Sequence, residues 1–380
     1  MFLALRELRF ARGRFGLMGA VIVLIAVLTV MLSGLASGLV NDGVSGLKSL
    51  PVSAFAFDAG TKIDNAFSRS VVDATQLAAW RSQPNVADAT LFGVRMANAT
   101  TGDGKQVDLT LFGVKPDSFL APATSEGQRV GAIDGIVVSP TARADGLHVG
   151  SVITLDHMGT RLVVVGFTDG QSTFGHVDVA YLPLATWQLI ASGRAEPGAP
   201  TAAQIAALDA PGASVIALRA EHGTTLDLAA GDRAANTVSQ SLEASFGASP
   251  GYTAETMTLS MIQAFLYAIC ALVVGAFFTV WTIQRKHEIS VLRAIGASTG
   301  FLLRDGLAQA ALILVGFTAL GVVAGVGLGW LMPDAMPFAL EVAPVAAAIG
   351  LMVALGLLGA AAAVLRITRI DPLEALGGQR

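Results

Sequence analysis

Four uninterrupted apolar segments constrain this chain more than any other feature of its sequence. They cover about residues 16–38, 262–283, 307–331 and 342–365. Each has the roughly 20 apolar residues that an α-helix needs to cross the hydrocarbon core of a bilayer. Only 14% of the residues are charged, against about 25% in soluble domains. We therefore expect an α-helical membrane protein with four transmembrane helices.

The first of these segments can also be read as a secretory signal peptide, because basic residues precede it. Its apolar core is longer than the ~7–15 residues of such a peptide, and no A-x-A cleavage pattern follows it. We therefore favour a membrane anchor that stays in the protein.

The positions of Lys and Arg predict how the four helices are oriented. Basic side chains lie before the first segment, between the second and third, and in the C-terminal tail, whereas residues 332–341 contain none. Short loops rich in Lys and Arg stay in the cytoplasm. Only an even number of spans satisfies all three basic regions. We predict a multi-pass protein of the plasma membrane with both termini cytoplasmic.

The segments and loops together predict the domain organisation. In chain order we expect an amphipathic cytoplasmic N-terminal helix (1–15), a first transmembrane helix (16–40), a large extracytoplasmic domain (41–255), a second transmembrane helix (256–283), a cytoplasmic coupling helix (284–299), a third transmembrane helix (300–331), a short extracellular loop (332–341), a fourth transmembrane helix (342–366) and a cytoplasmic tail (367–380).

The charge of the chain is divided between its parts. Residues 41–255 carry 13 Lys and Arg against 21 Asp and Glu, whereas the rest of the chain has 11 against 7. An acidic exterior domain argues against nucleic acid as its partner. The basic remainder suits the anionic membrane lipids at the cytoplasmic surface.

Within the exterior domain, short alternating runs and helical patterns predict an α+β fold. We expect strands over 135–140 and 176–184, a hairpin over 150–168, and helices over 70–86, 184–193 and 201–210. A stretch rich in Ala, Pro and Gly predicts a smaller inserted subdomain near residues 185–245.

A short charged segment, "TIQRKHEISVLRAIGAST" (282–299), interrupts the apolar part of the chain. Its apolar residues recur at helical spacing, Gly296 is a helix stop, and Ser298 can cap the next helix. One interpretation is a solvated loop that obeys the charge rule. The other is a helix that seats in a groove of a cytoplasmic partner, and its candidate coupling residues are Arg285, Lys286, Glu288, Leu292 and Arg293.

The stretch "RKHEISVLRAIGAST" resembles the cytoplasmic signature of MacB/FtsX-type (type VII) ABC transporter permeases, and "RITRIDPLEALGG" near the C-terminus resembles the ending of that family. Within the family the chain is most similar to the haem-exporter group (HrtB) and its DevC-like relatives. The resemblance implies half of a membrane homodimer, driven by a separate cytoplasmic ABC ATPase (HrtA-like).

The sequence agrees that ATP is bound elsewhere. A phosphate-binding loop needs GxxxxGK[ST], and the chain's Gly104-Lys105 pair is followed by Gln. No Ser/His/Asp arrangement or HExxH motif is visible either. We therefore predict a transport permease rather than an enzyme, with no cofactor of its own and with ATP on the partner subunit.

Candidate substrate residues lie near the outer ends of the first two transmembrane helices. Gly34 and Gly38 form a GxxxG spacing that permits close helix packing, and we expect this face to pack against its twin in a dimer. Met31 lies on the same face, and its thioether is a known type of axial ligand for haem iron. We name Met31, Leu35, Met261 and Phe265 as candidate haem-binding residues, with ordinary packing as the alternative for each methionine.

Haem is the leading expectation for a hydrophobic or amphipathic substrate captured from the outer leaflet at the homodimer interface. A lipid, a peptide or an antibiotic is an alternative cargo. A further alternative is mechanotransmission, in which ATP hydrolysis inside the cell moves the exterior domain to regulate a partner.

Overall fold

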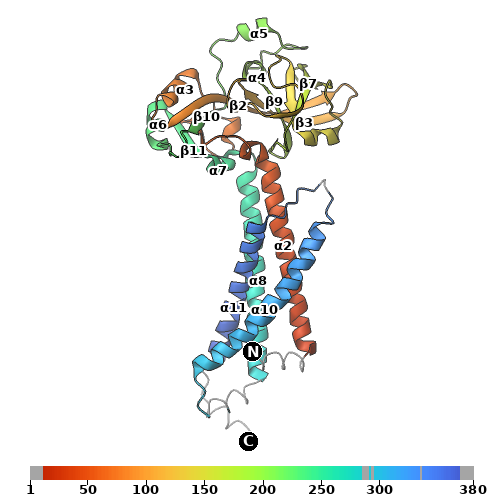
Figure 1. The fold of residues 1–380 in the computed structure, drawn as a ribbon, viewed down its shortest axis with the longest axis vertical. Helices are drawn as coiled ribbons and strands as arrows, with labels where there is room; N and C mark the ends of the chain where they lie inside the picture. Colours follow the sequence, from red (N-terminus) through yellow and green to blue (C-terminus); the bar gives the residue numbers. More distant parts are fainter. Residues whose placement is uncertain (1–11, 285–290, 292–294, 334–335, 369–380) are drawn as a thin grey trace. The chain divides into compact units, whose positions relative to one another are not determined.

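The computed structural model describes residues 12–284, 291, 295–333 and 336–368, and it divides the chain into two compact units. One unit, the exterior domain, contains residues 40–255; the other, the helical unit, contains the residues before and after it (Figure 1). Most of the predicted N-terminal helix (1–15), nearly all of the coupling helix and the tail from residue 369 lie outside the described residues.

The helical unit has four long apolar helices, as the sequence predicts: α2 (Arg12–Lys48), α8 (Tyr252–Gln284), α10 (Thr299–Gly329) and α11 (Val342–Thr368). Each is long and apolar enough to cross a membrane. With 37 residues, α2 is roughly 55 Å long at 1.5 Å per residue. It therefore extends well beyond the ~30 Å of a hydrocarbon core, and it does not end at the predicted residue 40.

Glycines let α10 approach α2 closely. A Cβ atom added at Gly321 would lie 2.5 Å from the Ala26 Cβ and 2.7 Å from the Val23 carbonyl oxygen, and one at Gly325 would lie 2.9 Å from the Val30 Cβ. Helices in lipid gain stability from such close backbone packing, because lipid tails give no hydrophobic driving force between helices. The small-residue ridge of α10 is therefore a packing surface.

The exterior domain is a mixed sheet of eleven strands with helices on it. In chain order its elements are β1 (Ala54–Asp58), α3 (Ala74–Arg81), β2 (Val86–Thr101), β3 (Gln106–Val114), β4 (Thr124–Gly127), β5 (Gly135–Val138), β6 (Val152–Leu155), β7 (Arg161–Thr168), β8 (Thr173–Phe174), β9 (Val177–Pro183), α4 (Leu184–Ala191), α5 (Ala202–Ala206), β10 (Val215–Ala220), α6 (Leu228–Ala235), β11 (Thr237–Ser241) and α7 (Leu242–Ser245).

Six of these strands close into a barrel. The strand pairs run β2–β3, β3–β9, β9–β5, β5–β7, β7–β6 and β6–β2, which returns to the first strand. The first half of β2 instead pairs with β10, which continues through β1 to β11 as an open sheet. The long strand β2 thus belongs to both parts and joins them.

Alternate residues of the barrel strands face two different cores, as a strand period of two requires. Leu109, Ile153 and Ala180 belong to the core that includes the barrel interior. Phe112 and Tyr181 belong to an aromatic core on the other face, where rings meet edge to face at centroid distances such as 5.4 Å for this pair. The C-terminal end of α2 is buried in the aromatic core through Val44 and Leu47.

Trp187 of α4 lies on a flat platform made by two glycines. Gly93 of β2 and Gly113 of β3 are paired across the ladder. A Cβ added to Gly93 would lie 2.2 Å from the indole ring, and one added to Gly113 would lie 2.5 Å from Trp187 Cβ. Only glycine leaves room for the backbone of two strands to contact this large side chain.

The predicted strands near 135–140 and 176–184, the hairpin over 150–168 and the three predicted helices are confirmed as β5, β9, β6–β7, α3, α4 and α5. The predicted inserted subdomain near 185–245 is wrong. Strands β10 and β11 lie within this range and pair with β1 in the common sheet. The Ala-, Pro- and Gly-rich stretch is a surface excursion around α5, after which the chain returns to the sheet.

Candidate functional site

The helical unit contains a cavity of about 450 Å³, within the ~300–1,000 Å³ range of small-molecule sites. Helix α2 contributes one wall, α8 a second, and the loop after α10 a third. Its lining residues are Leu28, Met31, Leu32, Leu35, Ile262, Phe265, Leu266, Ile269, Met332, Met336 and Phe338. All of them are apolar, and three are methionines.

The helix periodicity explains why these side chains meet. Leu28, Met31, Leu32 and Leu35 are spaced three and four residues apart, so they form one stripe on α2. Ile262, Phe265, Leu266 and Ile269 repeat the same spacing on α8. Two of the cavity walls are therefore apolar stripes on facing helices, and the loop after α10 forms the third wall.

The loop contacts α2 at the predicted dimer glycines. A Cβ added at Gly34 would lie 2.4 Å from the Phe338 ring, and one at Gly38 would lie 2.2 Å from the Pro337 carbonyl oxygen. The Ala339 amide also donates a hydrogen bond to the Gly34 carbonyl oxygen at 3.0 Å. Within one chain, this face of α2 is thus packed against the loop after α10. The contact of Gly34 and Gly38 with their twin in a dimer stays a prediction.

Three of the four predicted substrate residues come together. Met31, Leu35 and Phe265 all line the cavity. Met261 does not line it, and its side chain is 55% exposed. Phe265 lines the cavity and is also 63% exposed, so this side chain reaches from the cavity to the surface of the helical unit.

The sequence reasoning missed the loop residues Met332, Met336 and Phe338. The sequence does contain a sign of them. The stretch "MPDAMPF" (332–338) contains two methionines and an aromatic residue between two transmembrane segments. Helical spacing cannot detect them, because they come from irregular backbone whose position is set by contact with Gly34.

The predicted coupling residues Arg285, Lys286, Glu288, Leu292 and Arg293 lie outside the described residues. What the structure describes is the end of this segment. Gly296 has a left-handed backbone with φ 105, as expected of a helix stop. Ser298 caps α10, since its Oγ accepts a hydrogen bond from the Phe301 amide at 3.2 Å. The predicted stop and cap are confirmed.

Comparison with known proteins identifies the class of this helical unit. Residues 260–372 match the family model described as FtsX-like permease C-terminal. A protein of Staphylococcus haemolyticus named putative hemin transport system permease protein HrtB is 26% identical over all of this chain and 99% of its own length. Residues 260–372 are an FtsX-like permease domain. An uncharacterized ABC transporter permease of Mycobacterium tuberculosis is 25% identical over 100% of this chain and 99% of its own length.

A solved structure is also similar to the permease. The periplasmic region of MacB from Actinobacillus actinomycetemcomitans aligns with 51% of this chain and 91% of its own, at 11% identity and a TM-score of 0.36. The full-length relatives are named as ABC transporter permeases, a class that acts with a cytoplasmic ATPase. The permease is thus a membrane protein with four apolar helices and an α/β domain between the first and second.

Proposed function

We propose that the permease extrudes a hydrophobic or amphipathic molecule, with haem as the leading candidate, and that the cavity between α2 and α8 is its binding site. The observation that carries this proposal is the apolar lining with three methionines. Thioether sulfur is a soft ligand and an established axial ligand type for haem iron. The full-length similarity to a putative hemin transport permease supports the same cargo.

The chemistry of the lining fixes how haem would enter. None of the eleven lining residues is charged, and burying an unpaired carboxylate is very costly. The two propionates of haem would therefore stay outside the cavity, at water or lipid headgroups, while the apolar part of the macrocycle enters. Exposed Phe265 in the cavity wall supports lateral entry from the membrane.

The depth of the cavity supports entry from the outer leaflet. The α2 residues that line it begin at Leu28 and end at Leu35, roughly 20–30 Å of helix beyond Gly16 at 1.5 Å per residue. With the N-terminus in the cytoplasm, this level lies in the outer half of a ~30 Å hydrocarbon core.

The cavity offers further thioethers beside that of Met31, the ligand expected from the sequence. Met332 and Met336 line the same cavity as Met31. One permease chain therefore holds three thioethers around one space, and we propose that the second ligand comes from the loop after α10. The homodimer remains part of the proposal.

The test of the proposed cargo is a spectroscopic titration of haem into the full-length permease purified with its ATPase. A saturable change in the Soret band and a change in ATPase rate support haem. Absence of binding overturns haem as the cargo, and parallel titrations of other porphyrins, lipids and peptides then identify the class.

Energy for export is proposed to come from a separate, HrtA-like cytoplasmic ATPase that the segment 284–299 contacts. Arg293→Glu or Glu288→Ala is expected to lower transport per ATP hydrolysed about tenfold, because a charge-assisted hydrogen bond contributes about 1.5–3 kcal/mol. The measurement is transport and ATP turnover in the same vesicles. The control is Arg304→Glu, the same charge reversal at an exposed position of α10. If transport per ATP hydrolysed were equal in all variants, the segment would be interpreted as a solvated loop.

The proposed orientation has both termini in the cytoplasm. A single cysteine at position 150 of the exterior domain is expected to react with an impermeant maleimide on intact cells, whereas one at position 290 is expected to react only after permeabilisation. The native Cys270 is buried and is replaced by alanine for this measurement. Labelling of position 290 from outside would contradict the orientation.

One observation favours a second function, mechanical regulation through the exterior domain. The outer end of α2 is buried in the aromatic core of that domain, with Val44 and Leu47 fully buried. A helix anchored in this way can move the domain that holds it. Haem-independent ATPase activity together with a partner bound to the exterior domain would support this alternative.

A further inference from the structure

The turn that joins β8 and β9 has an unusual residue for its backbone conformation. It consists of Gly175 and His176, since Phe174 and Val177 are paired on either side. Both residues are left-handed, with φ 61 and φ 64, as in a type I′ hairpin turn. Glycine adopts this conformation freely, whereas a histidine does so at an energetic cost. Contacts of the His176 side chain are available to offset that cost.

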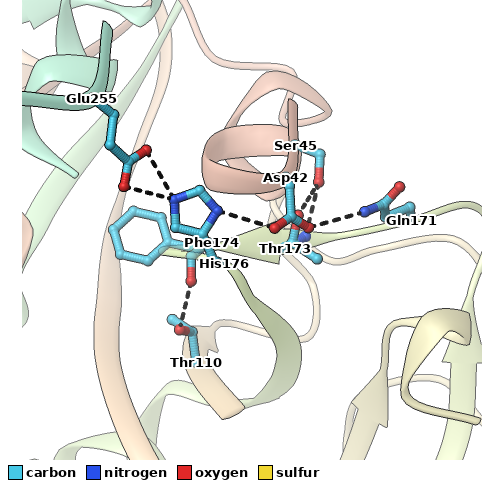
Figure 2. Close-up of polar contacts among 8 residues, drawn as sticks. All are labelled: Asp42, Ser45, Thr110, Gln171, Thr173, Phe174, His176 and Glu255. Carbon is cyan, nitrogen blue, oxygen red and sulfur yellow. Dashed lines mark hydrogen bonds and ion pairs between the residues drawn. The ribbon is translucent and has the colours of Figure 1, made fainter. Parts of the chain in front are cut away.

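The imidazole of His176 lies between two carboxylates from the outer ends of two helices (Figure 2). Its Nδ1 is 3.0 Å from Oδ2 of Asp42 in α2. Its Nε2 is 3.1 and 3.0 Å from the two carboxylate oxygens of Glu255 in the first turn of α8. About a third or less of each of these three side chains is exposed. His176 thus joins the two helix ends that belong to the exterior domain.

The backbone of the turn is also fixed to α2. The Gly175 amide donates to the Gly43 carbonyl oxygen at 2.9 Å, and the Thr173 amide donates to the Ser45 Oγ at 2.9 Å. The hydroxyl groups of Ser45 and Thr173 are 2.6 Å apart. These contacts hold the turn on α2 alone, so the link to α8 in this group of residues runs through the His176 side chain (Figure 2).

The geometry determines the charge that His176 needs. A neutral imidazole has one N–H and one lone pair, whereas the imidazolium has two N–H donors. Only the imidazolium can donate to Asp42 and Glu255 together. A third acid lies nearby: burial raises the pKa of Asp178 in β9, and charge repulsion from Asp145 and Asp42 adds to this, although hydrogen bonds from Thr141 and Ser139 oppose it. The charged groups that the described residues bring to this imidazole are thus carboxylates from α2, α8 and, through Asp42, β9.

We propose that His176 is a proton-dependent pin that ties the outer ends of α2 and α8 to the β8–β9 turn. The pin is closed when both ring nitrogens carry protons. Loss of one proton leaves a carboxylate facing a nitrogen lone pair, which repels it and breaks one of the two contacts. Imidazole ordinarily changes charge between about pH 5 and pH 8. An acidic exterior therefore tightens the hold on the two helix ends, and an alkaline exterior loosens it.

The test is hydrogen exchange of the full-length permease in nanodiscs, followed by mass spectrometry at about pH 6 and about pH 8.5. After correction for intrinsic rates, peptides covering residues 171–178 and 252–258 are expected to exchange about fivefold faster at the higher pH, the factor that ~1 kcal/mol corresponds to. His176→Asn is expected to exchange fast at both values, because asparagine tolerates the left-handed backbone but cannot carry the charge.

The matched control is His157→Asn. His157 is another histidine with a left-handed backbone, φ 67, exposed in the β6–β7 turn. This variant is expected to keep the pH dependence of the wild type. A pH dependence that persists in His176→Asn, or exchange in that variant equal to the wild type, would overturn the proposal.

A mutant cycle gives a second readout. The effects of Asp42→Asn and Glu255→Gln on exchange are expected to be non-additive in the wild type, because both act on one imidazole. In the His176→Asn background they are expected to add. Both single variants keep the turn residue unchanged, so they test the pin even where His176→Asn fails to fold. Additive effects in both backgrounds would show that His176 does not connect the two carboxylates.

Discussion

Met31→Ala is expected to shift the Soret band of haem bound to the permease and to weaken haem binding by about tenfold or more, a loss of ~1.4 kcal/mol. The variant removes a thioether that lines the α2–α8 cavity. The measurement is a haem titration of the purified permease, together with survival of cells that express the variant under haem stress.

The matched control is Met261→Ala. Both methionines were candidates by their sequence positions, but Met261 does not line the cavity and is 55% exposed. Met261→Ala is therefore expected to bind haem as the wild type does. Met332→Leu and Met336→Leu then identify the second ligand, because leucine conserves volume while removing sulfur. An unchanged spectrum in Met31→Ala would remove Met31 from the site, whereas no binding by the wild type would remove haem itself.

Gly321→Ala is expected to destabilise the helical unit by roughly 1–3 kcal/mol, the usual cost of forcing extra atoms into a close-packed contact. The new methyl group would lie 2.5 Å from the Ala26 Cβ and 2.7 Å from the Val23 carbonyl oxygen. Backbone atoms of α2 cannot move aside as a flexible side chain can. The measurement is thermal unfolding of the permease in detergent.

Two glycines of the same helix provide controls. Nothing lies within 4 Å of a Cβ added at Gly316 or Gly327, and both residues are exposed. Alanine at these positions is expected to be neutral or slightly stabilising, because alanine has the higher helix propensity by about 1 kcal/mol. If Gly321→Ala unfolded at the same temperature as these controls, the close contact between α10 and α2 would be contradicted.

The sequence predicted the membrane helices because a bilayer imposes a length and a composition that are visible without any partner. It predicted part of the cavity for a similar reason: Met31 and Leu35 share a face at helical spacing. Gly34 and Gly38 show the limit of this reasoning. Small residues indicate close approach, but they do not say whether the neighbour is a second copy or, as here, Phe338 of the same chain.

Long-range contacts explain the remaining differences. His176 meets Asp42 and Glu255 across 134 and 79 residues of sequence, and no periodicity connects them. The barrel was not predicted, because closure depends on β6 pairing with both β2 and β7, which only the assembled sheet determines. The sequence did not show that β10 and β11 belong to the common sheet. The Ala-rich stretch before them has the composition of a linker, which suggested that a separate subdomain follows it.

The closed ring of six strands has a consequence for the solubility of this domain. An open sheet ends in unpaired amide and carbonyl groups, which act as templates for pairing with another chain. In the closed ring each of the six strands pairs with a neighbour on both sides, so few of its amide and carbonyl groups are unpaired. At the β11 end of the open sheet, the Asp232 carboxylate accepts a hydrogen bond from the Ser239 amide at 3.0 Å, which occupies a backbone donor of that strand. These two features reduce the number of unpaired backbone groups through which the domain could pair edge to edge with another chain.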